Sequence, residues 1–356
     1  MSFKTFHILD LSLARDPTTK PQFLNDLRHA LLEVSFLYLE NVGIPEELIQ
    51  AVIREGIAFF DLPDIEMKNV LSFLGCSKLV AEITKFEIDL REQIDLSTDH
   101  PVRRPHQALY CNLFAPTQWP SASYLPKFKP VYSEDITKMG EIGIFFTSLI
   151  SQAIGLRPDA FNKYFDKDQH HKLKIVKYHD LQELGLDSKG QVVGPHKDSM
   201  LTSYLLQIDC PPIDGTLVVA IGQGMEAFTQ GVCMSTTHRV LSPPPGSGAR
   251  FSVPFFQALS LDAEFAELND LDNGGDVGRI PEKAKDIRRQ IVKHNGDRLD
   301  DCEFTFQGGG VAKTLGEATL RNRIKSNPDV GERWYPEILK EIRALEAKEK
   351  YSEISV

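Results

Sequence analysis

Apolar residues recur with a helical period in three segments of the first 155 residues. In PQFLNDLRHALLEV (21–34) they fall on one face, which predicts an amphipathic helix. A second helix is predicted over 45–63, where a proline and two glutamates begin the segment and another proline closes it. The clearest helix covers 133–155, with Ser133 as its N-cap and Gly155 at its end.

After residue 165 the pattern changes to short β-branched and aromatic runs separated by Gly, Pro and Asp. These predicted strands cover 173–178, 201–207, 215–221, 236–241 and 249–256, and two earlier ones cover 6–9 and 35–45. Helical periods return at 282–294, 315–326 and 335–351. The chain therefore predicts a mainly β core, an antiparallel sandwich or barrel, with helices before and after it.

The stretch GPHKDSMLTSYLLQ (194–207) contains His196 and Asp198 with one residue between them. Positions i and i+2 of a strand share a face, so this is either a buried polar pair or part of a metal site. His238 lies near the start of a later strand, where a lone histidine would be a half-exposed strand residue. Two imidazoles and one carboxylate together form the facial triad that binds Fe(II) and leaves positions open for O₂.

Arg250 lies in the predicted strand 249–256 and shares a strand face with Ser252. A lone strand arginine is more often a solvated surface residue. Beside a metal site, however, a guanidinium and a hydroxyl on one face can bind a carboxylate by charge-assisted hydrogen bonds. We therefore expect this pair to anchor a cosubstrate that has a carboxylate.

The composition narrows the setting of this site. The chain has 356 residues and a net charge of −10, and no long Lys/Arg-rich stretch, which argues against nucleic acid or an anionic membrane as partner. No apolar run approaches the roughly 20 residues of a membrane helix. Its five cysteines form no CxxC pair, as expected in a reducing compartment. We expect a cytoplasmic enzyme.

Several longer motifs resemble one known family. SFLYLENVGIP is similar to its N-terminal strand, with Val42 in place of the usual histidine, and GEATLRNRIKSNPDVGERWYP is similar to the C-terminal segment of fungal members. The most specific match is GTLVVAIGQGMEAFTQGVCMSTTHRV, which places His238 in its family context. The chain thus resembles the Fe(II)/2-oxoglutarate-dependent dioxygenases of the isopenicillin N synthase-like superfamily.

The resemblance implies a fold and a division of the chain. The fold would be a double-stranded β-helix, or jelly roll, with N- and C-terminal helices packed outside it. The N-terminal dioxygenase region would cover 1–125, the Fe(II)/2-oxoglutarate jelly-roll core 170–260, and a C-terminal helical segment 261–356.

The resemblance also implies residue roles. His196, Asp198 and His238 would bind Fe(II), and Arg250 and Ser252 would hold the far carboxylate of 2-oxoglutarate. Tyr178 would assist them, although a core strand tyrosine is the alternative. With O₂, the enzyme would decarboxylate 2-oxoglutarate to succinate and CO₂ while it hydroxylates, desaturates or cyclises a small organic molecule of secondary metabolism.

One departure from the family pattern concerns the core. Only 39 residues separate Asp198 from His238, and the Gly-Leu-x-Val…Gly-x-Trp hairpin of relatives is missing. Pro211 and Pro212 cannot continue a central strand because they lack amide hydrogens. The chain is therefore expected to leave the sheet after Gln207, to re-enter it at 215–216, and to leave a gap beside the His196 strand.

Two alternatives remain open. An iron oxidase of the isopenicillin N synthase type would need no 2-oxoglutarate, and its arginine and serine would hold a substrate carboxylate instead. A non-catalytic member, disabled by the shortened barrel, is the other. A zinc hydrolase is disfavoured because no HExxH helix accompanies the triad.

Overall fold

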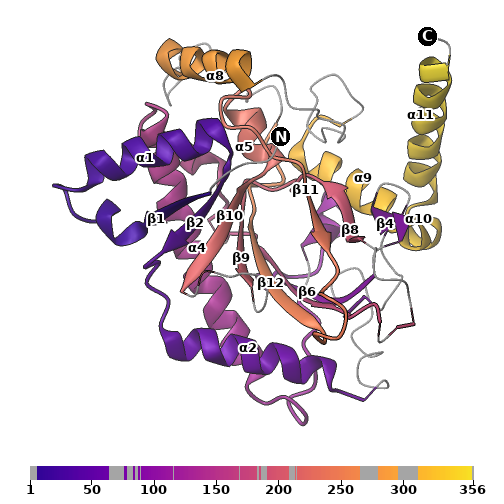
Figure 1. Ribbon diagram of the computed structural model, residues 1–356. Coiled ribbons are helices and arrows are strands. Elements are labelled where there is room, and N and C mark those ends of the chain that lie inside the picture. The colour runs from indigo at the N-terminus through magenta and orange to yellow at the C-terminus, as the bar shows by residue number, and fades with distance from the viewer. Residues whose placement is uncertain are drawn as a thin grey trace.

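The computed structural model describes residues 6–63, 76–77, 83–84, 87–88, 90–114, 116–167, 169–182, 184–185, 191–207, 213, 215–264, 280–295 and 312–354. Two β-sheets form its centre, and helices pack around them (Figure 1). Within these residues, no helix combines the length and the apolar character that crossing a membrane requires.

The larger sheet has the strand order β1-β2-β10-β9-β12-β7-β6-β3 in the described part of the chain. Its strands are β1 (His7–Asp10), β2 (Phe36–Glu40), β10 (Thr216–Ile221), β9 (Thr202–Gln207), β12 (Arg250–Gln257), β7 (Lys172–Tyr178), β6 (Arg91–Ser97) and β3 (Cys76–Ser77). All neighbours are antiparallel except β1 and β2. Because side chains alternate along each strand, the sheet presents two different faces.

The smaller sheet pairs β8 (Gln191–His196) with β11 (His238–Leu241). Val192 and Val193 on β8 pack with Val176 and Tyr178 on β7, so one face of the large sheet lies toward the small one. The two sheets enclose the interior of a jelly roll, as the family resemblance implied. A short ribbon of β4 (Ile83–Thr84) and β5 (Glu87–Ile88) lies near β8.

Helices cover the opposite face of the large sheet. These are α1 (Lys20–Glu33), α2 (Glu46–Phe60) and α4 (Phe128–Ala153), which Figure 1 shows on the side away from β8 and β11. Phe146 of α4 packs edge-on against Tyr204 of β9, and both are fully buried. This layer forms the main hydrophobic core.

The remaining helices are α5 (Gln223–Phe228), α8 (Glu282–Asn295), α9 (Leu315–Ser326), α10 (Pro328–Trp334) and α11 (Pro336–Ile354), with 3₁₀ turns at Leu11–Ala14, Leu109–Leu113 and Asn162–Tyr164. The C-terminal helices share a second, smaller apolar cluster that includes Leu113, Ile324 and Leu339.

Most predicted elements agree with the structure to within a few residues, but the start of the long helix does not. Ser133 was predicted as its N-cap, yet α4 begins at Phe128. Pro130 falls in the first turn, where a missing N–H costs nothing, and Phe128 and Tyr132 extend the buried stripe. The strand β6 and the helix α10 were not predicted, and the expected His196 strand, for which no bounds were predicted, is β8.

The chain leaves the large sheet at Gln207 and re-enters it at Thr216, as expected from the shortened sequence. The strands β9 and β10 are direct neighbours, and β10 begins at Thr216. The small sheet has two strands in the residues that the structure describes. Pro211 and Pro212 lie outside the described residues.

We predict that a relative's hairpin inserted after Gln207 raises the melting temperature, because a two-stranded sheet gains little stability alone and a longer sheet gains more. Thermal unfolding followed by circular dichroism measures this, with a Gly/Ser insert of equal length as control. Equal melting temperatures for both inserts would contradict this account of the gap.

Candidate metal centre

The antiparallel pairing of β8 with β11 brings two histidines together. His196 ends β8, His238 begins β11, and the two are direct partners across the ladder. Their imidazole centroids are 4.4 Å apart. Both rings are partly exposed, with 30% and 23% of their side-chain surface accessible. A ligand in the interior can therefore reach both.

Asp198 completes the group. Its Oδ1 lies 3.9 Å from Nε2 of His196 and 3.8 Å from Nε2 of His238. Two ligands that each bind one ion at about 2.1 Å are at most about 4.2 Å apart, so both separations suit a shared metal. Among the described residues, His196, Asp198 and His238 form a group that could hold a metal ion, since their ligand atoms all lie within 4.8 Å of one another.

Backbone carbonyls fix the tautomer of both histidines. Nδ1 of His196 lies 2.8 Å from the carbonyl of Gly194, and Nδ1 of His238 lies 3.0 Å from that of Thr236. A carbonyl oxygen only accepts, so each Nδ1–H must donate. Each Nε2 then keeps its lone pair, which is the form that binds a metal.

Burial also favours the neutral imidazole of His196. The pKa of this ring is lowered to about 4, mainly by burial and secondly by the neighbouring His238, while the Asp198 carboxylate acts in the opposite direction. A neutral imidazole is ready to bind a cation without first losing a proton. The donor set of two neutral nitrogens and one carboxylate therefore fits a divalent ion such as Fe(II).

The sequence suggested that Asp198 and His196 share a strand face. This prediction is wrong, because β8 ends at His196 and Asp198 lies beyond the strand. A loop positions the carboxylate instead. The carbonyl of Asp198 accepts from Gln223 N at 2.7 Å, and that of Leu201 accepts from Gly222 N at 3.0 Å. A Cβ on Gly222 would lie 2.0 Å from the carbonyl oxygen of Met200, so this approach requires glycine.

Glu226 of α5 connects the two segments that hold the ligands. Its Oε2 lies 3.3 Å from Nζ of Lys197, the residue between His196 and Asp198, and accepts from Ser235 N at 2.8 Å. The Lys197 side chain is 1% exposed. One carboxylate thus joins the loop after β8 to the segment before β11.

The structure also brings the predicted anchor residues together. Arg250 and Tyr178 are direct partners on β12 and β7, and the guanidinium carbon lies 4.7 Å from the centroid of the Tyr178 ring. Ser252 follows two positions later on the same face and is buried. Nη2 of Arg250 also donates to the carbonyl of Leu241 at 3.3 Å, which ties β12 to β11.

Sequence reasoning missed Arg91. It begins β6 and is the direct partner of Tyr178, so it lies on the same face as Arg250 with Tyr178 between them. Its charge is close enough to lower the pKa of His196. The alternation of apolar and polar residues in LREQIDLS (90–97) could have predicted a strand and hence this arginine.

Two family models match the chain. The first, described as non-haem dioxygenase in morphine synthesis N-terminal, matches residues 6–122. The second, described as 2OG-Fe(II) oxygenase superfamily, matches residues 161–258. The second match includes all six predicted site residues.

Relatives match over nearly the whole chain. The 2-oxoglutarate-dependent dioxygenase frbJ of Dothideomycetidae sp. (strain 11243) is 56% identical over 372 residues, covering 98% of this chain and 97% of the relative. A 2-oxoglutarate-dependent dioxygenase of Gibberella zeae is 30% identical and covers 98% and 96%. The first alignment is longer than this chain of 356 residues, so the relative has residues at some aligned positions where this chain has none.

A solved structure shows the same fold. The full-length Neurospora crassa T7H in complex with alpha-KG and thymine superposes with a TM-score of 0.62 at 19% identity, over 81% of this chain and 97% of that one.

We predict that Glu226→Gln lowers both stability and Fe(II) affinity. Removing one charge of a buried pair costs about 3–5 kcal/mol, and the two ligand segments lose their common anchor. Thermal unfolding and Fe(II) titration measure the two effects.

Glu141→Gln is the matched control, because Glu141 forms an exposed ion pair with Lys138 and such pairs contribute about 0–1 kcal/mol. Adding Lys197→Met to Glu226→Gln should restore part of the stability. Equal effects of the two glutamine variants would show that Glu226 does not position the centre.

Proposed function

The chain belongs to the 2OG-Fe(II) oxygenase superfamily, and on this premise we propose that His196, Asp198 and His238 hold its iron. It is an Fe(II)- and 2-oxoglutarate-dependent dioxygenase, an oxidoreductase, as its resemblance to this family had predicted. The observation that supports the ligand assignment best is the position of Asp198 Oδ1, less than 4 Å from two Nε2 atoms that both keep a lone pair.

We propose that Arg250 and Ser252 bind the far carboxylate of 2-oxoglutarate. In the described part of the chain, the Ser252 hydroxyl has no hydrogen-bond partner, so it can donate to a ligand. The second arginine on this face, Arg91, adds positive charge on the other side of Tyr178. Two guanidinium groups in a partly buried interior favour a dianionic cosubstrate.

Tyr178 contributes in a second way. Its ring lies against the Arg250 guanidinium, and a cation over an aromatic face is attracted by about 0.5–2 kcal/mol. The ring thus orients the guanidinium, and its hydroxyl can assist the carboxylate.

Iron, 2-oxoglutarate and O₂ supply the oxidising chemistry when bound: 2-oxoglutarate loses CO₂ to become succinate, and the second substrate is oxidised. The residues of the chain hold the groups that react. Three protein ligands on one side leave the other side for the cosubstrate and O₂. Arg250 and Ser252 orient 2-oxoglutarate by binding its far carboxylate. The apolar residues between the sheets, such as Val176 and Val193, exclude water.

We propose a small organic molecule of fungal secondary metabolism as second substrate, supported by the similarity to the fungal frbJ dioxygenase. We also propose a cytoplasmic location and a division into an N-terminal region (1–125), a core (170–260) and a C-terminal helical segment (261–356).

We predict that His196→Ala and Asp198→Ala each abolish stoichiometric Fe(II) binding and succinate formation, because two ligands hold an ion far more weakly than three. Fe(II) titration and mass spectrometry of 2-oxoglutarate turnover measure this. Circular dichroism should show an intact fold, with His29→Ala, outside the centre, as control. Full iron occupancy and turnover in either variant would exclude the assignment.

We predict that Arg250→Ala raises the KM for 2-oxoglutarate about 10- to 150-fold, since a hydrogen bond to a charged group contributes about 1.5–3 kcal/mol. Iron should still bind. Tyr178→Phe, which keeps the ring, should raise KM less than Tyr178→Ala.

An unchanged KM for 2-oxoglutarate in Arg250→Ala would show that Arg250 does not bind the far carboxylate of this cosubstrate. Oxygen consumption without succinate in the unmodified protein would instead favour the 2-oxoglutarate-independent type of iron oxidase.

A further inference from the structure

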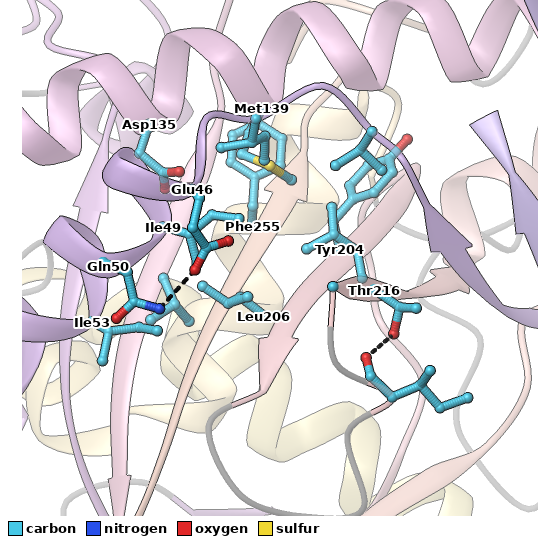
Figure 2. A pocket seen from close by; sticks show the side chains of 16 residues that line it. Glu46, Ile49, Gln50, Ile53, Asp135, Met139, Tyr204, Leu206, Thr216 and Phe255 are labelled. Carbon is cyan, nitrogen blue, oxygen red and sulfur yellow. Dashed lines mark hydrogen bonds between the residues drawn. The ribbon is translucent and has the colours of Figure 1, made fainter. Parts of the chain in front are cut away.

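A cavity of about 450 Å³ lies on the helix-facing side of the large sheet, between the sheet and the helices α2 and α4 (Figure 2). Its floor consists of side chains of β9, β10 and β12, including Tyr204, Leu206, Leu217, Val253 and Phe255. The metal centre lies on the other side of this sheet. Ser252, which faces the interior, and Val253, which faces the cavity, are consecutive on β12.

Most of the residues that line the cavity are apolar, and polar atoms contribute almost half of its exposed lining. Val42, Ile44, Ile49, Ile53 and Met139 complete it from the segment after β2 and from the two helices. Figure 2 shows three polar side chains on one side: Asp135 from α4, and Glu46 and Gln50 from α2. A cavity that is lined mainly by apolar residues and has a few polar groups on one side is typical of small-molecule sites.

Asp135 is the unusual member of this wall. It is 7% exposed, and among the described residues no group donates a hydrogen bond to its carboxylate or forms an ion pair with it. Burial, and secondly the neighbouring Glu134, raise its pKa to about 7. An acidic group buried without a partner is costly, so its presence at a cavity indicates a ligand that would supply the partner.

The charges around the cavity favour a cation. Glu46 is the second carboxylate of the lining and accepts from Gln50 Nε2 at 2.8 Å. Among the described residues that line the cavity there is no lysine or arginine, and those on the strands are uncharged. On α4 itself, Glu134 adds negative charge, and Lys138, one turn after Asp135, pairs with Glu141 at 3.3 Å.

We propose that this cavity binds an organic ammonium ion, with the ammonium group beside Asp135 and Glu46 and the apolar body against the aliphatic and aromatic floor. The cavity volume suits a compact amine, since small-molecule pockets usually measure about 300–1,000 Å³. This site is separate from the metal centre, and its test does not depend on catalysis.

Three probes of similar shape test the charge preference: 2-phenylethylammonium, 2-phenylethanol and 3-phenylpropionate. Isothermal titration calorimetry or ligand-observed NMR with the full chain measures binding. We expect the ammonium to bind most tightly and the carboxylate most weakly. Affinity for the ammonium should rise about tenfold from pH 6 to pH 8, because Asp135 becomes ionised over this range, whereas affinity for the alcohol should not rise.

Asp135→Asn keeps the shape of the side chain and removes its charge. It should remove the preference for the ammonium over the alcohol, together with the pH dependence. Glu47→Gln is the matched control, because Glu47 is exposed in the first turn of α2 and does not line the cavity. It should bind all three probes as the unmodified protein does.

Ile53→Trp fills the cavity from α2 and should weaken binding of all three probes, which locates the site. Three results would overturn the proposal: no ammonium binding at millimolar concentration, equal affinity for the three probes, or an unchanged ammonium preference in Asp135→Asn. Melting temperatures of the variants verify that each is folded.

Discussion

The pairing of β8 with β11 is the interaction on which the metal centre depends. Both histidines project from this ladder at directly opposed positions. A two-stranded ribbon has little stability alone, so the geometry needs support from outside it. Glu226 supplies one connection through Lys197 and Ser235, and the backbone of residues 222–224 supplies another. The centre is therefore held by α5 and the large sheet as much as by its own strands.

The large sheet separates two environments because its side chains alternate. On β12, Arg250 and Ser252 face the interior, while Val253 and Phe255 pack toward the helices. A substitution on the interior face thus changes the proposed site, and one on the helix-facing side changes the packing of the core. Both faces share the same strand backbone. The same alternation puts Arg91 of β6 on the interior face beside Tyr178 and puts Ile94 of β6 on the opposite face, in the main hydrophobic core.

Much of this could be predicted from the sequence where local rules decide. The period of apolar residues located α1, α2, α9 and five strands of the core, and residue chemistry selected the three candidate ligands. Ser133 misled because capping preference lost to the buried Phe128 and Tyr132. The position of Asp198 beyond its strand, and the alignment of Arg91 with Arg250 through Tyr178, depend on long-range pairing that no local pattern encodes. The roles of these residues and the division of the chain stay predictions.

Each imidazole donates a hydrogen bond to a carbonyl two residues earlier, and these bonds lower the conformational entropy of the two side chains. Gly194 and Thr236 belong to the same segments as the rings that they orient, so each ring is held by its own backbone. Ordering a free side chain costs up to about 2 kcal/mol on burial. Here that cost is met when the strands form, before any ion arrives. Capture of the ion then requires little rotation of the imidazoles, so little of the binding free energy is lost to ordering the two ligands.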